Sequence, residues 1–222
     1  MGIRASPVDE GSAVTTCGRV VVLDYGAGNV RSVVKALEHE GADVVFSSDP
    51  AVARQAGRLV LPGQGHFGQC IGSLEEGGLA DAIREVVADE RPFLGICVGM
   101  QLLYEGSEEA PGVPGLGLLP GLVRRIPTEL HLPHVGWNGV AFSDQAVVDP
   151  LLAGFNASEP RYFYHVHSYA QLDVENCQVL GVCRYDVPFA SVVGHGRVWG
   201  AQFHPEKSQE WGLKLLRNFA RL

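Results

Sequence analysis

The sequence lacks a long hydrophobic run and a cluster of basic residues. Its unbroken apolar stretches span only a few residues, whereas a membrane-spanning helix needs about 20. There are 17 Lys and Arg against 25 Asp and Glu, which gives a formal net charge of −8, and the basic residues are too scattered to neutralise a phosphate backbone. We therefore expect neither a membrane nor a nucleic acid among its partners.

Cysteine is also scarce, and the five cysteines form no CxxC pair. A chain of 222 residues buries enough apolar surface to fold without disulfides, so this usage fits a reducing cytoplasm. We expect Cys70, Cys177 and Cys183 to be small apolar fillers, because none lies in a turn motif or beside a recognisable base. Residues 1–18 have no apolar core after a basic start, so they are expected to form a flexible extension rather than a secretory signal.

Alternating strand and helix patterns fill the first half of the chain. The β-branched apolar run 19–24 predicts a buried strand, and residues 30–37 carry apolar side chains at helical spacing after Asn29, which stands at the N-cap position. The alternation continues with expected strands at 42–46, 58–61 and 92–96 and expected helices at 78–89 and 100–104. Strands that alternate with helices predict a parallel sheet.

The second half of the chain has a different sequence pattern. From residue 113 onward, short alternating runs are separated by Pro and Gly, which is typical of antiparallel strands added to the sheet. The expected elements are strands at 121–126, 181–185 and 198–203 and a helix at 211–222. Because no Ser-rich or charged linker divides the halves, we expect a single α/β domain over residues 19–222.

A cysteine between two glycines carries the strongest chemical signal. In Gly95-Ile96-Cys97-Val98-Gly99, the flanking glycines permit a sharp strand-to-helix turn that lifts the side chain of a nucleophile from the sheet. The amide groups at the N-terminus of a helix favour the thiolate form of such a cysteine. Taken alone, the string is equally compatible with an inert buried cysteine.

A thiolate catalyst needs a base, and Gln202-Phe203-His204-Pro205-Glu206 offers one. The carboxylate of Glu206 could orient the imidazole of His204, completing a catalytic triad with Cys97. A surface histidine beside a solvated glutamate is the commoner explanation of such a pair. However, residues 198–203 resemble a strand, so His204 would project from the strand end, where α/β sheets bind ligands.

Attack on an amide creates an oxyanion, which must be stabilised by N–H donors. The segment Pro62-Gly63-Gln64-Gly65 follows an expected strand, and its glycines allow a peptide to turn its N–H toward a substrate. The amide of Val98, directly after the candidate nucleophile, is a possible second donor. Taken alone, the segment is better explained as an ordinary glycine turn.

Other candidate sites have simpler explanations. His165 and His167 alternate along an expected strand, but no carboxylate or cysteine accompanies them at ligand spacing, so we expect no metal. The segment Gly26-Ala27-Gly28 lacks both the third glycine of a dinucleotide site and the lysine of a P-loop, so we expect no nucleotide.

Together, the strings around Cys97 and His204 resemble the class I (triad) glutamine amidotransferases, which cleave glutamine to glutamate and ammonia. Four further segments are similar to the branch of that family that serves imidazole glycerol phosphate synthase in histidine biosynthesis: 24–29, 133–138, 165–169 and 207–208. The resemblance covers about residues 19–222. It implies a flavodoxin-like α/β fold with a mixed, mostly parallel central sheet and flanking helices.

The resemblance also implies roles for individual residues. Cys97 matches the nucleophile, His204 the general base and acid, and Glu206 the residue that orients the histidine. The positions that match the glutamine-binding side chains and pocket are Gln101, Glu109, His167, Ser168 and Tyr169.

Gly63, Gln64 and Gly65 match the strand of the family that binds the oxyanion. That strand usually carries Val in place of Gln64 and a small residue in place of His66. Because the donor is a backbone N–H, these differences need not abolish function, but they are expected to alter how easily the peptide reorients.

The implied partner is a (β/α)8 cyclase subunit in a heterodimer, which uses the ammonia to make imidazole glycerol phosphate and an aminoimidazole carboxamide ribotide. Glutamine is the implied substrate, with no cofactor. Trp137 and Asn138 match positions at the subunit interface, although Trp137 could instead belong to the core. Two alternatives stay open: a glutaminase subunit of another pathway, and a non-catalytic binding subunit on the same scaffold.

Overall fold

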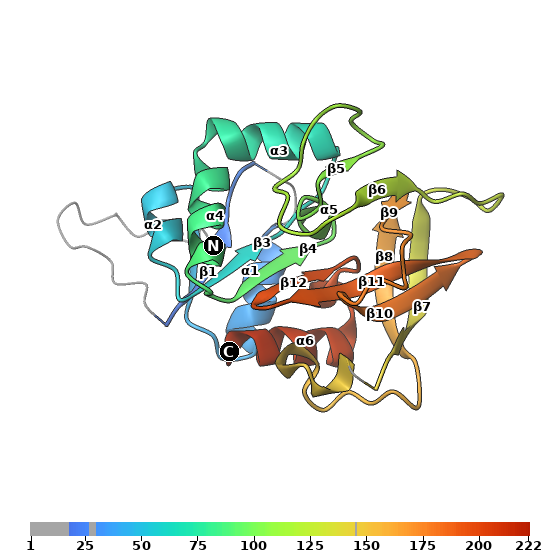
Figure 1. The fold of residues 1–222 in the computed structure, drawn as a ribbon. Helices are drawn as coiled ribbons and strands as arrows, with labels where there is room; N and C mark the ends of the chain where they lie inside the picture. The colour runs from blue at the N-terminus through green and yellow to red at the C-terminus, as the bar shows by residue number, and fades with distance from the viewer. Residues whose placement is uncertain (1–17, 27–29, 145) are drawn as a thin grey trace, which may run out of the picture.

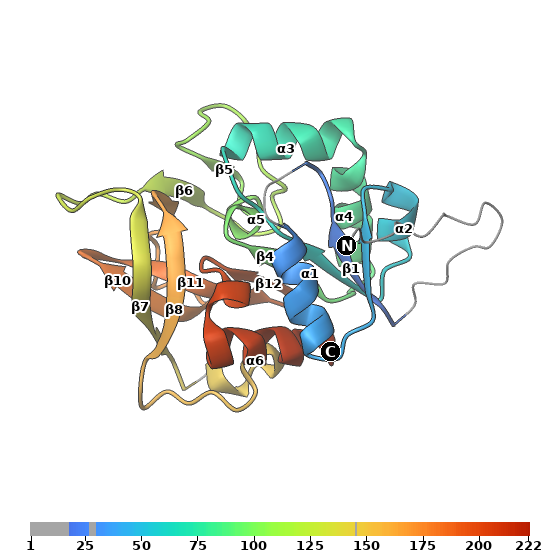
Figure 2. The same ribbon diagram turned by 180° about the vertical axis from the view of Figure 1, so that it is seen from behind.

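The computed structural model describes residues 18–26, 30–144 and 146–222 and has a nine-stranded sheet at its centre (Figures 1 and 2). The strand order is β2-β1-β3-β4-β12-β11-β10-β7-β8. The parallel strands are β1 (Val20–Leu23), β2 (Val44–Ser47), β3 (Arg58–Leu61), β4 (Phe93–Ile96) and β12 (Val198–Ala201). The antiparallel strands are β7 (His134–Phe142), β8 (Arg161–His167), β10 (Val179–Tyr185) and β11 (Val187–His195). This architecture confirms the expected α/β class.

Helices cover both faces of the parallel part of the sheet (Figures 1 and 2). On one face lie α1 (Val30–His39) and α6 (Gln209–Ala220), which contact each other. On the other face, α4 (Leu79–Ala88) packs against α2 (Pro50–Arg54) and α3 (Phe67–Glu76). The short helix α5 (Val98–Gln101) follows β4. Strands β1, β4 and β12 are buried along their whole length, as strands covered on both faces must be.

Smaller elements complete the fold. A three-stranded sheet contains β5 (Gly106–Ser107), β6 (Leu122–Arg125) and β9 (Tyr169–Ala170). The 3₁₀ helices are η1 (Ala146–Val148), η2 (Pro150–Leu152) and η3 (Pro205–Lys207). Among the described residues, no helix has both the length and the apolar character that a bilayer crossing requires.

The sequence missed several of these elements. Helix α3 was not expected, because Gly68 and Gly72 interrupt its pattern, although its buried residues do follow helical spacing. Helix α2 was also missed, and α5 occupies Val98–Gln101 rather than 100–104. The proposed cap Asn29 and residues 1–17 of the expected extension lie outside the described residues.

Three glycines bring backbone segments into direct contact at the carboxyl ends of β3 and β4. A Cβ atom on Gly99 would overlap the carbonyl oxygen of Leu61, and one on Gly63 would overlap the amide nitrogen of Gly99. A Cβ atom on Gly95 would lie 2.5 Å from the carbonyl oxygen of Gly99. The absence of side chains at these positions therefore lets α5 begin directly against both strand ends.

We expect Gly99→Ala to lower the free energy of unfolding by about 3 kcal/mol, because the new methyl group would collide with backbone that cannot move independently. Urea denaturation of the purified chain measures this change. Gly72→Ala is the matched control, since Gly72 lies in α3 with open space where its Cβ would be. That substitution should stabilise the chain by about 0.5–1 kcal/mol, and equal effects of the two changes would contradict the argument.

Candidate active site

Cys97 occupies a strained turn between β4 and α5. Its backbone has φ +55° and ψ −112°, a conformation that residues other than glycine rarely adopt. Its N–H donates a hydrogen bond to the carbonyl of Ala201 at the end of β12, 2.7 Å away. The turn has the geometry that the flanking glycines predicted, and the side chain is 4% exposed.

His204 and Glu206 follow β12 and form a buried pair. The Nδ1 atom of His204 lies 2.8 Å from Oε1 of Glu206, and the two side chains are 3% and 1% exposed. The backbone of His204 is held on both sides, because its N–H donates to the carbonyl of Tyr164 and its carbonyl accepts from the hydroxyl of Ser208. The commoner alternative of a solvated surface pair is therefore wrong.

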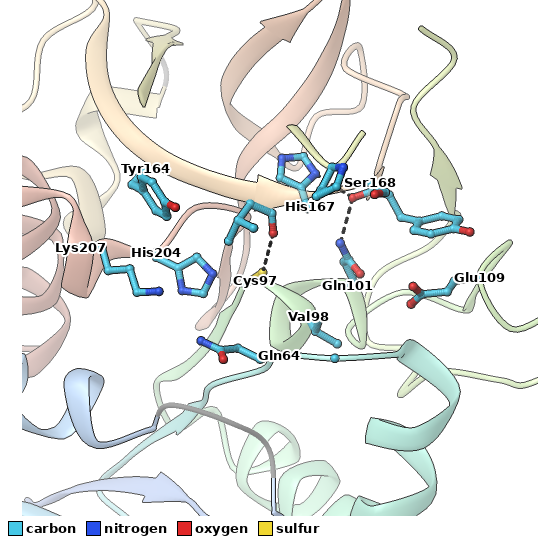
Figure 3. Close-up of a pocket in the computed structure, with 14 residues that line it drawn as sticks. Gln64, Cys97, Val98, Gln101, Glu109, Tyr164, His167, Ser168, His204 and Lys207 are labelled. Atoms are coloured by element: carbon cyan, nitrogen blue, oxygen red, sulfur yellow. Dashed lines mark hydrogen bonds between the residues drawn. The ribbon is translucent and has the colours of Figure 1, made fainter. Parts of the chain in front are cut away.

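The Nε2 atom of His204 is buried and makes no hydrogen bond within the described part of the chain. In Figure 3 the imidazole ring and the sulfur of Cys97 lie next to each other at one side of the pocket. Burial lowers the pKa of His204, but its interactions with Cys97 and Glu206 outweigh this and raise the pKa to about 9. At neutral pH the imidazole therefore carries its proton beside the sulfur.

We expect Cys97→Ala to lower the pKa of His204, because the interaction with sulfur that raises it is lost while the burial that lowers it remains. The pH dependence of the imidazole nitrogen resonances in NMR spectra measures this shift. Cys177→Ala, which removes an exposed thiol, is the control. An unchanged His204 pKa in the Cys97 variant would show that the sulfur does not act on the ring.

The same proton affects stability. His204 binds it more tightly in the folded chain than in the unfolded chain, where the pKa of histidine is about 6.5. Its contribution to stability is therefore complete below pH 6.5 and is lost as the pH rises through about 9. Urea denaturation across this pH range should show a smaller decrease in the free energy of unfolding for Cys97→Ala than for the wild-type chain.

A cavity of about 420 Å³ opens beside Cys97 and His204 (Figure 3). All five residues predicted to bind substrate line it: Gln101, Glu109, His167, Ser168 and Tyr169. The side-chain amide of Gln101 donates to the carbonyl of Tyr169 at 2.9 Å, and the carboxylate of Glu109 accepts from the N–H of Phe67 at 2.7 Å. The sequence thus predicted most of the residues that line this cavity, Cys97 and His204 among them.

Most of the predicted oxyanion segment also faces this cavity. Gln64, Gly65 and Val98 line it, whereas Gly63 lies behind them against the backbone of α5. His66 caps helix α3, because its Nδ1 accepts a hydrogen bond from the N–H of Gly68 at 3.2 Å. His66, which stands where the family usually has a small residue, therefore has a structural role at the start of that helix.

Sequence reasoning missed several residues of the site. Pro133, Tyr164, Val166 and Lys207 line the cavity. Gln202 is fully buried, and its side-chain nitrogen lies 4.0 Å from the sulfur of Cys97. Alternation along β8 was the available signal for Tyr164 and Val166, since every second residue of a strand shares a face.

Two expectations about side-chain burial need correction. Trp137 is 46% exposed, so the alternative that it belongs to the core is wrong. Its neighbour Asn138 donates to the carbonyl of Arg184 at 2.9 Å. Among the expected fillers, Cys70 and Cys183 are buried but Cys177 is exposed, because it lies in the loop before β10.

The alternating histidines are packed inside the fold. His165 contacts the carbonyl of Phe163 and the hydroxyl of Ser191, and His167 contacts the carbonyl of Tyr169. Burial is the main cause that lowers the pKa of His167 to about 3, so its ring is neutral at physiological pH. Both histidines are therefore buried side chains whose rings form hydrogen bonds inside the protein.

Comparison with known proteins adds evidence independent of this geometry. A family model described as glutamine amidotransferase class-I matches residues 21–222. The imidazole glycerol phosphate synthase subunit HisH of Methylococcus capsulatus is 45% identical, over 91% of this chain and 95% of that protein. Subunit HisH 1 of Pseudomonas aeruginosa is 48% identical, over 90% and 95%.

Solved structures support the fold alone. A chain of PurLQS from Thermotoga maritima superposes with a TM-score of 0.71 at 20% identity, covering 91% of this chain and 97% of that one. A structure described as a glutamine amidotransferase has a TM-score of 0.70 at 20% identity, covering 91% and 99%.

Proposed function

The chain belongs to the class-I glutamine amidotransferases, and we propose that it hydrolyses glutamine as the glutaminase subunit of an imidazole glycerol phosphate synthase. The observation that carries this proposal is the placement of Cys97, in its strained turn, beside the buried His204–Glu206 pair at the wall of a cavity. Relatives that bear this subunit's name are 43–48% identical over at least 90% of the chain.

The proposed reaction begins with attack of the Cys97 thiolate on the carboxamide carbon of glutamine. The N–H groups of Gln64 and Val98 stabilise the resulting oxyanion. His204 then donates its proton to the leaving nitrogen, so that the C–N bond breaks, ammonia departs and a glutamyl thioester remains. The raised pKa of His204 supports this order, because the ring holds the required proton before attack.

The second half returns the enzyme to its starting state. Neutral His204 takes a proton from water, and the hydroxide so formed attacks the thioester carbon. When this intermediate collapses, the C–S bond breaks to release glutamate, which leaves the Cys97 thiolate beside protonated His204. The carboxylate of Glu206 holds the ring through Nδ1 in both halves, so that Nε2 faces the reacting atoms.

The cavity wall offers complementary charge to glutamine. We propose that the carboxylate of Glu109 attracts the ammonium group of the substrate, with Gln101 and the segment 167–169 shaping the rest of the pocket. Because Glu109 also accepts a hydrogen bond from the N–H of Phe67, it would connect substrate binding to the segment that carries the oxyanion donor.

Ammonia released into water at neutral pH becomes ammonium, which is not a nucleophile, so a partner must receive it directly. The proposed partner is a (β/α)8 cyclase subunit, with Trp137 and Asn138 at the interface. Val135, Trp137 and Tyr162 expose 57%, 46% and 60% of their surface on β7 and β8. Trp137 pairs with Tyr164 and Val135 with Val166 across these strands, and both partners line the cavity. This apolar face is therefore continuous with the cavity wall, as a docking site for an ammonia acceptor should be.

The test of the proposed function is ammonia release from glutamine, measured with and without the cyclase subunit and its nucleotide ligand. We expect slow release from the chain alone and faster release from the complex. Equal rates would contradict the coupling, and association with the synthase of a different pathway would favour the alternative glutaminase. The described cysteines are free thiols, which is compatible with the cytoplasmic location that we propose.

We expect Trp137→Ala to weaken binding of the cyclase subunit about 30-fold, because a large aromatic side chain near the centre of an interface contributes about 2 kcal/mol. Titration calorimetry measures the Kd. Phe46→Ala is the matched control: Phe46 is 44% exposed and lies on β2, at the opposite edge of the sheet from β8. Equal weakening by both substitutions would place the interface elsewhere.

A further inference from the structure

Two side chains outside the cavity hold the segment that carries the proposed oxyanion donor. The hydroxyl of Tyr25 donates a hydrogen bond to the carbonyl of Pro62, 2.7 Å away. The thiol of Cys70 donates to the carbonyl of Gln64, 3.5 Å away. These two carbonyls belong to the peptide groups directly before and directly after the Gly63–Gln64 peptide. The N–H of that central peptide is the N–H of Gln64, the proposed oxyanion donor.

The two contacts come from different parts of the fold. Tyr25 follows β1 and Cys70 lies in the first half of α3, and their side chains also interact with each other. Burial is the main cause that raises the pKa of each group, so both remain protonated donors at neutral pH. Neither residue lines the cavity, and neither was assigned a role by the sequence beyond the expectation that Cys70 fills space.

These contacts restrict which part of the segment can rotate. If the carbonyls of Pro62 and Gln64 stay in place, a change in the direction of the Gln64 N–H requires rotation of the Gly63–Gln64 peptide, through ψ of Gly63 and φ of Gln64. Gly63 is itself pressed against the backbone of Gly99, which opposes movement of the segment as a whole. The Gln64 N–H therefore belongs to a peptide whose two neighbouring peptides are each held by a hydrogen bond.

We propose that Tyr25 and Cys70 are positioning residues that hold the peptides flanking the Gly63–Gln64 peptide and thereby aim the Gln64 N–H at the oxyanion. This inference rests on the proposed glutaminase function. It assigns Cys70 a hydrogen-bonding role in place of simple filling. An oxyanion donor acts in the transition state, so a loss of aim should lower kcat while leaving KM nearly unchanged.

The test measures glutamine hydrolysis by the full chain, alone and with the cyclase subunit. We expect Tyr25→Phe to lower kcat about tenfold and Cys70→Ala about threefold, with KM within about twofold of wild type, because each removes the hydrogen bond to one flanking carbonyl. Cys70→Ser keeps a donor and should restore most of the loss. Cys183→Ala removes another buried thiol, far from this segment in β10, and should leave kcat unchanged.

Alkylation of Cys97 by iodoacetamide separates aiming from a general disturbance of the site, because alkylation forms no oxyanion. We expect the same alkylation rate in wild type, Tyr25→Phe and Cys70→Ala. Unchanged kcat in both variants, an increase of KM alone, or a parallel fall of kcat and alkylation would overturn the proposal. If Tyr25→Phe does not fold, the comparison of Cys70→Ala with Cys70→Ser still decides the outcome. A wild-type chain that alkylates but never hydrolyses glutamine would instead refute the proposed function.

Discussion

Cys97→Ala is expected to abolish glutamine hydrolysis while the complex with the proposed cyclase subunit still uses added ammonia. Alanine fits the buried site but has no sulfur to form the thioester. Removal of a nucleophile that acts as part of a triad lowers kcat by about four to six orders of magnitude in comparable enzymes. The change leaves the cyclase subunit untouched, so synthesis supplied with an ammonium salt should continue.

The two assays use the same complex with either glutamine or an ammonium salt as the nitrogen source. Cys183→Ala is the control, since it also removes a buried thiol and should retain both activities. More than about 1% residual glutamine-dependent activity in Cys97→Ala would exclude Cys97 as the nucleophile. Labelling of the wild-type chain by a glutamine-like electrophile distinguishes the remaining alternative, since a non-catalytic binding subunit would stay unlabelled.

The parallel part of the fold was predictable because its signals are local. Strands such as β1 and β4 are short apolar runs, and α1 and α4 repeat apolar residues at helical spacing between them. Each strand is covered on both faces, so its sequence is apolar throughout rather than alternating. The period of the pattern therefore changes sharply from strand to helix.

The antiparallel part was harder to predict for three physical reasons. Only the part of β8 around His165 and His167 was expected as a strand, because these two buried side chains are polar and hide the alternation of buried and exposed positions. Strands β10 and β11 pair with register shifts around Gly181, which interrupts the period of two. Strand β7 exposes Trp137 at an apolar face that the isolated chain leaves uncovered. A hydrophobicity pattern alone cannot recover strands whose polar residues are buried and whose apolar residues are exposed.

In the candidate site, too, the features that depend on neighbouring residues were predictable and the contacts between distant residues were not. The turn at Cys97 depends on glycines two residues away, and the His204–Glu206 contact spans two residues, so short strings contain both. The contact from Gln202 to Cys97 spans 105 residues, and that from Tyr25 to Pro62 spans 37. Contacts at such separations depend on how the strands and helices pack, which no local string specifies.

Glu206→Gln is expected to lower kcat for glutamine by about three to four orders of magnitude. The amide has the shape of the carboxylate but no charge, so it no longer stabilises the protonated ring of His204 through the 2.8 Å contact at Nδ1. The substitution should also lower the pKa of His204, because it removes one of the interactions that raise it to about 9 against the effect of burial. The ring would then lack the proton that the leaving nitrogen requires at neutral pH.

Two measurements test this expectation, namely kcat as a function of pH and the NMR titration of His204 in the same variant. Activity that remains in Glu206→Gln should decline at a lower pH than in the wild type, following the lower pKa of the ring. Glu210→Gln is the matched control, since it removes an exposed carboxylate in the first turn of α6, four residues away in sequence. If Glu206→Gln lowered kcat without shifting the His204 titration, the carboxylate would act by holding the ring in place rather than by keeping it charged, and the order of proton transfer proposed for the first half-reaction would be wrong.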